Sequence, residues 1–213
     1  MIDFYTLAST RRSIRRFTAE DVPEKDIEDC IRTAVTAPSG CNSQCWRFVA
    51  VWNRDVLARM ADAATAKADE LMQTLGAAAE PEYVGSKKKM LTFFARAPVC
   101  IAVFMTELEY YDTKMTALWL SQGHTADQMM ALYGHPDLLS VGAAIQNLLL
   151  AFHEKGYGAC WMNDPVIAGP AINDILGVER KYPLISLIPV GRPSYNPRAK
   201  ALKPLGDIFS TID

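Results

Sequence analysis

Arginine is concentrated in one short stretch near the N-terminus, Arg11–Phe17, which reads RRSIRRF. Arg11, Ser13 and Arg15 occupy alternate positions, so an extended backbone would place all three side chains on one side. Guanidinium groups bind phosphate oxygens in pairs, and a hydroxyl adds a further donor. The stretch therefore predicts a phosphate-binding site. The alternative is a solvated basic face after a helix, which is what a run of charges commonly forms.

A second polar stretch lies in the loop Ala37–Trp46, where Pro38–Gln44 reads PSGCNSQ. Its hydroxyl and amide side chains offer both donors and acceptors, and such groups can recognise the polar edge of a heteroaromatic ring. Proline and glycine in the same stretch are typical of a turn. A turn that only ends the preceding helix is therefore the alternative, and it is the favoured interpretation of this stretch taken alone.

Several common catalytic motifs are missing from the sequence. The stretch Gly156–Trp161, GYGACW, lacks the third glycine of a dinucleotide-binding GxGxxG and follows a predicted helix instead of a strand. No GxxxxGK[ST] phosphate loop and no HExxH zinc motif occur. The three histidines, His124, His135 and His153, are dispersed. Nothing in the sequence therefore indicates a metal site or a Ser–His–Asp triad.

The composition is that of an ordinary globular protein, with 213 residues, 50% of them hydrophobic and 22% charged. A net charge of −2 argues against a general nucleic-acid binder, so the arginine stretch is a local feature. Five cysteines without a CxxC motif are typical of reduced thiols. No signal peptide and no apolar run of membrane-spanning length is evident, which predicts a cytoplasmic protein.

Hydrophobic periodicity and turn residues divide the chain into the elements that would position the two polar stretches. The clearest helix is Leu139–Lys155, which has a wide apolar face and which Gly156 would end. Val99–Met105 is the clearest strand, because it is a continuous apolar run. Further helices are expected at Asp3–Ser9, from Pro23 to near Pro38, and at Arg54–Ala79, Ser86–Phe94 and Pro170–Leu176, with an interruption at Glu80–Gly85. Further strands are expected at Phe48–Trp52, Ala159–Met162 and Leu184–Val190.

The region Thr106–Asp137 is polar and aromatic, and we expect a helix-containing excursion or lid there. Helices and strands are mixed along the chain without regular βαβ alternation, which favours an α+β fold over a doubly wound sheet. No internal repeat, low-complexity tract or linker is evident, so residues 1–213 are expected to form a single domain.

Taken together, RRSIRRF and, one helix later, APSGCNSQCWRF closely resemble the paired motifs of the nitroreductase family of FMN-dependent oxidoreductases. Cys45 departs from the family pattern, which usually has proline at this position. Two later segments are also similar. VGAAIQNLLLAFHEKGYGACWM resembles the family's long central helix with the strand after it, and LIPVGRP resembles the strand before its C-terminal arm. The resemblance covers nearly the whole chain but does not explain Thr106–Asp137.

The resemblance implies an α+β, nitroreductase-like fold with a mixed central β-sheet flanked by helices, in an intertwined homodimer with FMN at its interface. Residues 192–213 would be the arm that wraps the partner. The FMN phosphate and ribityl chain would be bound by Arg11, Arg12, Ser13 and Arg15, completed by Lys200 and Lys203. The other subunit would bring Pro38, Ser39, Gly40, Asn42 and Gln44 to the flavin. The flavin ring would lie along the backbone of Cys160, Trp161, Met162 and Asn163.

The resemblance also implies a ping-pong reaction in which NAD(P)H reduces FMN and a nitroaromatic, quinone or similar electron-poor small molecule then accepts the electrons. No catalytic side chain is expected, because FMN carries the chemistry. Small apolar packing is the favoured role of Cys41, Cys45 and Cys160 near this site, with a redox role as the alternative.

Two other functions remain open on the same resemblance. One is reductive dehalogenation, as in iodotyrosine deiodinases, or flavin-modifying chemistry, because Thr36–Gly40, TAPSG, is similar to the deiodinase branch. That branch grips an amino acid with a Glu, a Tyr and a Lys. Glu80 or Glu82, Tyr83 and Lys87–Lys89 supply these residue types, but their spacing does not match. The more remote alternative is a non-catalytic flavin-binding protein.

Overall fold

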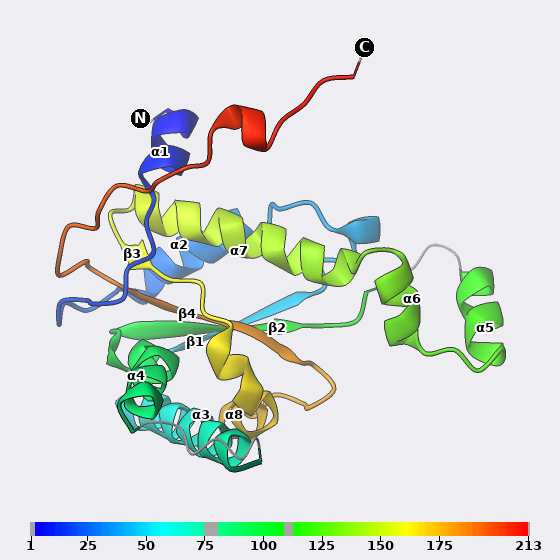
Figure 1. Ribbon diagram of the computed structural model, residues 1–213, viewed down its shortest axis with the longest axis horizontal. Coiled ribbons are helices and arrows are strands. Elements are labelled where there is room, and N and C mark those ends of the chain that lie inside the picture. Colours follow the sequence, from blue (N-terminus) through cyan, green and yellow to red (C-terminus); the bar gives the residue numbers. More distant parts are fainter. Residues whose placement is uncertain (1–2, 75–80, 109–112, 213) are drawn as a thin grey trace.

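A β-sheet lies between two layers of helices in the computed structural model of the chain, which describes residues 3–74, 81–108 and 113–212. On one face of the sheet lie α2 (Glu24–Ala34) and α7 (Pro136–Glu154), as Figure 1 shows. On the other face lie α3 (Arg54–Thr74), α4 (Pro81–Thr92) and α8 (Gly169–Leu176). The α+β class predicted from the sequence is confirmed.

The described sheet has four strands in the order β1 (Trp46–Val51), β2 (Val99–Met105), β4 (Leu184–Gly191) and β3 (Gly158–Ala159). Each neighbouring pair is antiparallel. A parallel bridge between Ser13 and Ala159 adds a parallel component at the β3 edge. The arginine stretch is therefore attached to the sheet at β3, which in turn pairs with β4.

The central strand β2 is apolar on both faces because helices cover both faces. Alternate residues point in opposite directions along a strand, and they divide the core in two. Ile101 and its neighbours at period two pack in a buried cluster with residues of α2 and α7, whereas Phe104 belongs to a second cluster with residues of α3 and α8. The sheet is thus held rigidly from both sides.

The central helix α7 is the element that the sequence describes best. Its predicted apolar face is buried, namely Val141, Ala144, Ile145, Leu148, Leu149 and Phe152. The helix starts earlier than predicted, at Pro136, because proline is favoured in the first turn of a helix. His135 precedes it in the left-handed conformation with φ 55°. As predicted, Gly156 follows the helix with φ 77°, a conformation that glycine adopts without strain.

Several predicted boundaries are wrong. The interruption expected at Glu80–Gly85 is helical from Pro81 onward, because proline is tolerated at a helix N-terminus. The strand expected at Ala159–Met162 is only Gly158–Ala159, with Met162 in an isolated bridge to Leu187. Smaller shifts occur in α1 (Phe4–Thr10), in α2, which ends at Ala34, and in β1, which begins at Trp46. The end of the helix predicted to reach Ala79 lies outside the described residues, as do Glu80 and residues 109–112.

The excursion predicted at Thr106–Asp137 does contain helices, α5 (Thr113–Ser121) and α6 (Ala126–Leu132). They lie beside the N-terminal end of α7 (Figure 1), and a role as a lid stays a prediction. Trp119 of α5 stacks on His124, with 4.1 Å between the ring centroids. Among the described helices, none is long and apolar enough to cross a membrane.

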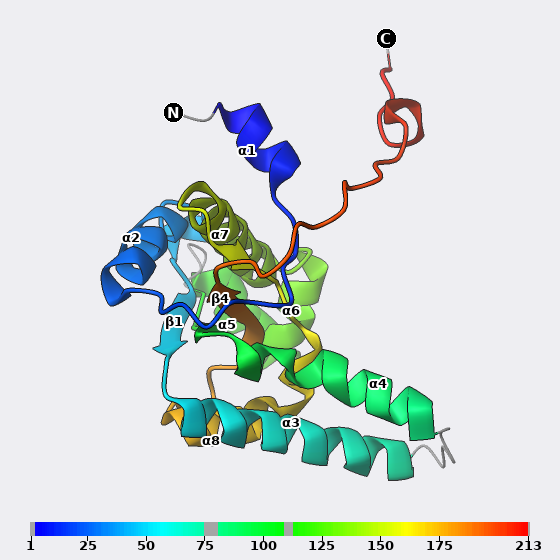
Figure 2. The same ribbon diagram turned by 90° about the vertical axis from the view of Figure 1, so that its left-hand side faces the viewer.

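Both ends of the chain leave the body of the molecule on the same side (Figure 2). The first helix, α1, buries none of its residues, and Phe4 and Tyr5 are 74% and 80% exposed. The C-terminal segment also exposes large apolar side chains, at Leu202, Leu205, Ile208, Phe209 and Ile212. An apolar surface of this kind commonly marks an interface with another chain.

Candidate functional site

The arginine stretch is extended, as predicted, and is hydrogen-bonded to the β3 edge of the sheet. The Ile14 amide donates to the carbonyl of Ala159 at 3.0 Å, and the Thr18 amide donates to the carbonyl of Arg192 at 2.9 Å. Ile14 is buried at 4% exposure, so its neighbours Ser13 and Arg15 point away from the core. The backbone thus presents the alternate side chains together.

Close packing against Gly158 fixes this arrangement. A Cβ atom at residue 158 would lie 2.6 Å from Cγ1 of Ile14 and 2.7 Å from its Cβ. Carbon atoms in contact are normally about 3.5–4.0 Å apart, so only glycine fits here. The sequence therefore needs a glycine at the start of β3 for the arginine stretch to reach the sheet.

An open pocket, hereafter the anion pocket, is lined by residues from the two ends of the chain, five of which are basic: Arg11, Arg12, Ser13, Arg15, Tyr195, Pro197, Arg198 and Lys200. The guanidinium of Arg12 is already hydrogen-bonded to the backbone, because it donates to the carbonyls of Ser9 at 2.6 Å and Arg198 at 3.2 Å. Within the part of the chain that the structure describes, the guanidinium groups of Arg11 and Arg15 make no hydrogen bond or ion pair, although the backbone amide of Arg11 donates to the carbonyl of Leu7 at 3.3 Å. Their guanidinium groups are therefore available for an anion.

Only one of the two C-terminal lysines predicted for this site lines the pocket. Lys200 lines the anion pocket, whereas Lys203 is exposed and does not line it. Sequence reasoning missed Arg198 and Tyr195, which both line the pocket. Tyr195 lies under the guanidinium of Arg16 at 4.6 Å, a cation–π contact. The signal that could have found them is the basic and aromatic composition of the segment after Pro193.

The stretch Cys160–Asn163 runs beside β4, next to the arginine stretch. The Met162 amide donates to the carbonyl of Leu187 at 3.0 Å, and the side-chain amide of Asn163 donates to the carbonyl of Ile185 at 3.3 Å. Cys160, Trp161, Met162 and Asn163 line a small pocket together with Arg15, Met90, Phe93 and Asp164. The phosphate and ring segments predicted from the sequence are therefore adjacent in one chain, through Arg15.

The thiol of Cys160 is a poor candidate for redox chemistry. Burial raises its pKa, although Arg15, Ser13 and Arg11 act in the opposite direction. A raised pKa leaves little of the reactive thiolate at neutral pH. This supports a packing role for Cys160.

The second polar stretch is anchored to the N-terminal end of α7. The Gly40 amide donates to Oγ of Ser140 at 3.0 Å, and that hydroxyl donates to the carbonyl of Pro136 at 2.5 Å. Within the loop, the Gln44 amide donates to Oγ of Ser39 at 3.0 Å. Three non-glycine residues hold left-handed backbones, with φ of 57° at Cys41, 51° at Asn42 and 47° at Gln44. Such strain is characteristic of functional loops that their surroundings hold in place.

One polar atom of this loop lacks a partner. Oγ of Ser43 is buried and makes no hydrogen bond within the described ranges. Asn42 and Gln44, on either side of it, are exposed. The loop therefore holds more hydrogen-bonding capacity than the described chain uses.

The two halves of the predicted site lie at opposite ends of α7. Ser140 holds the loop at one end, and His153 lines a cavity with Arg11 at the other. Thirteen residues separate them, which corresponds to about 20 Å along an α-helix. Within one chain, the anion pocket and the Pro38–Gln44 loop therefore lie toward opposite ends of α7. Among the described residues there is also no cluster of three His, Cys, Asp or Glu side chains that could hold a metal ion.

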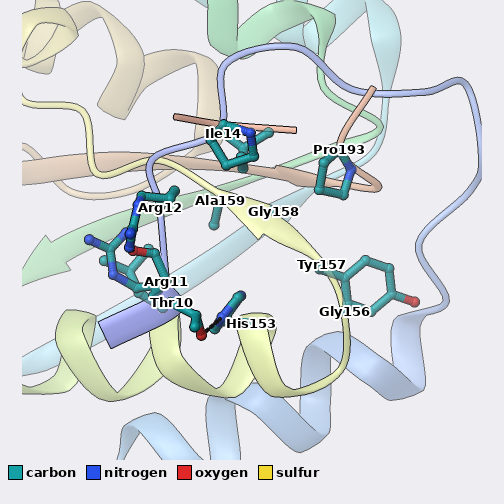
Figure 3. A pocket seen from close by; sticks show the side chains of 12 residues that line it. Thr10, Arg11, Arg12, Ile14, His153, Gly156, Tyr157, Gly158, Ala159 and Pro193 are labelled. Carbon is teal, nitrogen blue, oxygen red and sulfur yellow. Dashed lines mark hydrogen bonds between the residues drawn. The ribbon is translucent and has the colours of Figure 1, made fainter. Parts of the chain in front are cut away.

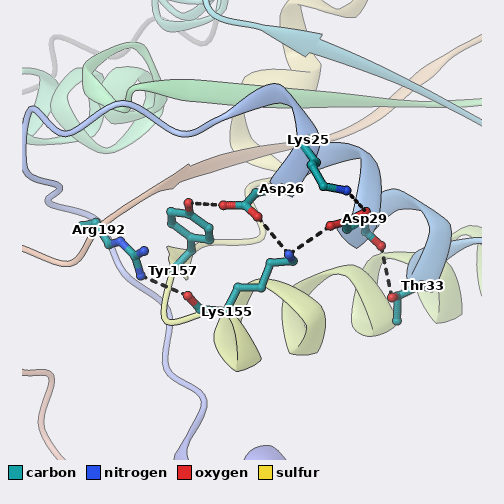
Figure 4. A network of polar contacts seen from close by, with 7 residues as sticks. All are labelled: Lys25, Asp26, Asp29, Thr33, Lys155, Tyr157 and Arg192. Atoms are coloured by element: carbon teal, nitrogen blue, oxygen red, sulfur yellow. Dashed lines mark hydrogen bonds and ion pairs between the residues drawn. The ribbon is translucent and has the colours of Figure 1, made fainter.

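A polar network fixes the C-terminal end of α7, as Figure 4 shows. Nζ of Lys155 donates to Asp26 at 2.8 Å and to Asp29 at 3.2 Å, and the hydroxyl of Tyr157 donates to Asp26 at 2.6 Å. Arg192 donates to the carbonyl of Lys155 at 3.0 Å and lies over the ring of Tyr157. The hydrogen bonds from Lys155 and then Tyr157 lower the pKa of Asp26. The network ties α2 and α7 to the turn that leads into β3.

Fold and sequence together define the class of this protein. A family model described as the Nitroreductase family matches residues 8–192, so the chain belongs to the nitroreductase family. Among curated relatives, the iodotyrosine deiodinase of Hydra vulgaris is 29% identical, over 99% of this chain and 73% of the relative. Iodotyrosine deiodinase 1 of Homo sapiens is also 29% identical, over 99% of this chain and 68% of the relative.

Solved structures have the same fold. A BluB-like flavoprotein from Clostridium difficile 630 is 28% identical and covers all of both chains with a TM-score of 0.86. An iodotyrosine deiodinase bound to FMN and 3-iodo-L-tyrosine is 22% identical, over 98% of both chains, with a TM-score of 0.69. A nitroreductase with bound FMN from Desulfitobacterium hafniense DCB-2 is 18% identical, over all of both chains, with a TM-score of 0.71. FMN, the cofactor expected from the sequence, is thus the cofactor of two such relatives.

Proposed function

We propose that this chain binds FMN and acts as an oxidoreductase that takes electrons from NAD(P)H and passes them to an electron-poor small molecule such as a quinone or nitroaromatic. Membership of the nitroreductase family and the FMN in its solved relatives support the cofactor. The observation that carries the proposal is the anion pocket, where Arg11 and Arg15 keep unpaired guanidinium groups beside Ser13 among the described residues.

The residues present fit FMN. Arg11, Ser13 and Arg15, together with Lys200, would hold its phosphate by charge-assisted hydrogen bonds. The adjacent backbone of Cys160–Asn163 would lie along the flavin ring. The polar edge of the ring would meet the other polar stretch, Pro38, Ser39, Gly40, Asn42 and Gln44, whose neighbour Ser43 has a buried hydroxyl without a described partner.

We further propose that the site is completed in a homodimer, with the loop Pro38–Gln44 supplied by the partner subunit. The arginine stretch adjoins one end of α7 and the loop adjoins the other, about 20 Å away along the helix, which supports a site completed by the partner's loop. The apolar surfaces of α1 and of residues 202–212 offer the area that such a dimer would bury. The cytoplasmic location stays a prediction.

Bound flavin supplies hydride transfer, which explains why no catalytic triad is needed. The protein would contribute binding and orientation. The arginine stretch would fix the phosphate end of the cofactor, and the β4 side would fix the ring. The helices α5 and α6, beside the N-terminal end of α7, would limit access to the ring and exclude water.

Reductive dehalogenation of an iodinated tyrosine is the second candidate. It is favoured by the deiodinase relatives, which are 29% identical over 99% of this chain. Helix α4 also presents an exposed Tyr83 with Nζ of Lys87 at 5.5 Å over its ring, a tyrosine–lysine pair that an amino-acid substrate could engage. Lys88 is not free for this role because it pairs with Asp69 at 2.7 Å.

The experiment is an anaerobic absorbance trace of the purified protein. A flavin spectrum that bleaches on addition of NADH or NADPH and recovers with a quinone supports the proposal. Bleaching by dithionite alone, followed by recovery with 3-iodo-L-tyrosine, supports the dehalogenase instead. A colourless protein that does not bind added FMN contradicts both, and a flavin that no donor and acceptor pair can cycle leaves a flavin-binding protein without this catalysis.

A further inference from the structure

A small cavity of about 170 Å³ lies at the C-terminal end of α7 (Figure 3) and adjoins the anion pocket. We call it the His153 cavity. Arg11, Arg12 and Pro197 line both spaces, so the two share a wall. The remaining wall of the His153 cavity comes from Thr10, Ile14, Leu149, His153, Gly156, Tyr157, Gly158, Ala159 and Pro193.

His153 is joined to the helix from which the arginine stretch extends. Its Nε2 lies 2.9 Å from Oγ1 of Thr10, the last residue of α1. The Thr10 hydroxyl has one proton, and that proton is directed to the carbonyl of Thr6 at 2.6 Å. Nε2 must therefore donate to Thr10, which leaves Nδ1 as the atom that gains a proton when the ring becomes charged. Protonation of His153 then keeps the bond to Thr10 intact.

The two other charged side chains that line the His153 cavity are both positive. Glu154, next to His153, and Asp26, which accepts from the hydroxyl of Tyr157 at 2.6 Å, do not line it. The extended segment contributes Arg11 and Arg12, the turn before β3 contributes the phenol of Tyr157, and the C-terminal segment contributes only prolines. No carboxylate among the described residues lines the cavity. Burial, and then the charges of Arg11 and Arg12, hold the pKa of His153 below its ordinary value. A bound dianion in the adjoining pocket would offset those two positive charges and so favour the charged ring.

We propose that His153 is a proton-linked positioning residue of the anion pocket, which takes up a proton when a phosphomonoester dianion binds. The proposal rests on the proposed binding of FMN and deepens it, because it makes cofactor retention depend on pH. His153 does not touch the ligand in this account. It acts through the end of α1 and through the charge that it adds behind Arg11.

The sign of the linkage follows from the direction of the shift. The ring is neutral at neutral pH in the free protein, and the bound phosphate raises its pKa, so binding and proton uptake favour each other. Affinity for FMN should therefore increase as the pH falls from about 8 to about 6.5. Each unit by which the phosphate raises the pKa corresponds to about tenfold in affinity. Below about pH 6 the phosphate itself takes up a proton, and the affinity should fall again.

The test is titration of the flavin-free protein with FMN between pH 6 and 9, with flavin fluorescence as the readout. We expect binding to tighten about threefold to tenfold between pH 8 and pH 6.5 in the wild type. His153→Gln can still donate to Thr10 but cannot be charged, so it should bind with the affinity of the high-pH wild type and lose the slope. Riboflavin, which lacks the phosphate, should show no slope with either protein. His124→Gln, at the surface stack with Trp119, is the matched control and should behave as the wild type.

Thr10→Val separates the two parts of the role. It removes the hydrogen bond to His153 but leaves a titratable ring, so binding should weaken while the pH slope remains. A wild type and a His153→Gln variant with the same pH slope would overturn the proposal and leave FMN binding standing. A wild type that binds neither FMN nor riboflavin would overturn the proposed function together with this inference.

Discussion

The packing of Ile14 on Gly158 gives the sharpest prediction about the phosphate half of the site. A Cβ at residue 158 would lie 2.6 Å from Ile14 Cγ1, about 1 Å closer than carbon atoms normally approach. Because Ile14 is buried, it cannot swing into solvent, and the two backbones must separate instead. The hydrogen bond from Ile14 to Ala159, now 3.0 Å, would then stretch beyond bonding distance.

Gly158→Ala should therefore destabilise the protein and weaken the site together. Overpacking costs about 1–3 kcal/mol and the lost hydrogen bond about 0.5–1.5 kcal/mol, so the free energy of unfolding should fall by about 2–4 kcal/mol. Ser13 and Arg15 flank Ile14 and must move with it. The loss of one charge-assisted contact to the phosphate is worth about tenfold in affinity for FMN.

Urea unfolding followed by circular dichroism would measure the first effect, and fluorescence titration with FMN the second, at one fixed protein concentration. Gly85→Ala is the matched control, because Gly85 lies in α4 with no atom within 4 Å of an added Cβ. It should stabilise the protein by up to about 1 kcal/mol through helix propensity and leave FMN binding unchanged. If Gly158→Ala unfolds at the same urea concentration as the wild type and binds FMN equally well, the reasoning about this contact is wrong.

Three further predictions concern other parts of the account. Arg15→Ala should weaken FMN binding about tenfold to a hundredfold in a fluorescence titration, with riboflavin affinity unchanged, because it removes a charged phosphate ligand. Ser140→Ala should also weaken FMN binding, and lower the free energy of unfolding by about 1–3 kcal/mol, because the Gly40 amide loses its acceptor. Asp26→Asn should reduce the amount by which the free energy of unfolding falls as the solution is made acidic. The folded-state pKa of Asp26 is lowered, so its contribution is present above the ordinary pKa of aspartate and is lost as the pH falls below about 4.

Each of these has a contradicting outcome. Equal retention of FMN and riboflavin by Arg15→Ala would remove Arg15 from the phosphate site. An unchanged unfolding curve for Ser140→Ala would mean that the loop is held by other contacts. Parallel stability curves for the wild type and Asp26→Asn between pH 2 and pH 6 would show that the bonds from Lys155 and Tyr157 do not lower the pKa of Asp26.

The local sequence pattern was sufficient to predict those elements in which one physical preference dominates. The apolar face of α7 and the continuous run of β2 are each explained by burial, and both are predicted with nearly correct bounds. The extended arginine stretch follows from alternation with the buried Ile14. The interruption predicted at Glu80–Gly85 is wrong from Pro81 onward, because a proline that ends one helix can equally begin another.

The candidate site was harder to predict, because it depends on which side chains are already hydrogen-bonded to other parts of the protein. From the sequence, Arg12 and Arg15 are equally good candidates to bind the phosphate. In the structure, Arg12 is hydrogen-bonded to backbone carbonyls, whereas the guanidinium of Arg15 is not. Lys203 has the same charge as Lys200 but does not line the anion pocket. The separation of the two polar stretches along α7 is also invisible in the sequence, since it arises from tertiary packing.

The central claim is that each FMN site is built from the arginine stretch of one subunit and the Pro38–Gln44 loop of the other. Arg15→Ala breaks the first half and an Asn42→Ala, Gln44→Ala double variant breaks the second. The homodimer of either variant should lose most of its FMN. The decisive measurement is the flavin content of the heterodimer made by co-expressing these two variants with different affinity tags.

The account predicts that the heterodimer regains one of its two sites, and so about half of the FMN bound by the wild-type dimer, because one site receives both intact halves. A site formed within one chain would leave a broken half in every site. A heterodimer that binds no more FMN than either parent variant would therefore contradict the shared site.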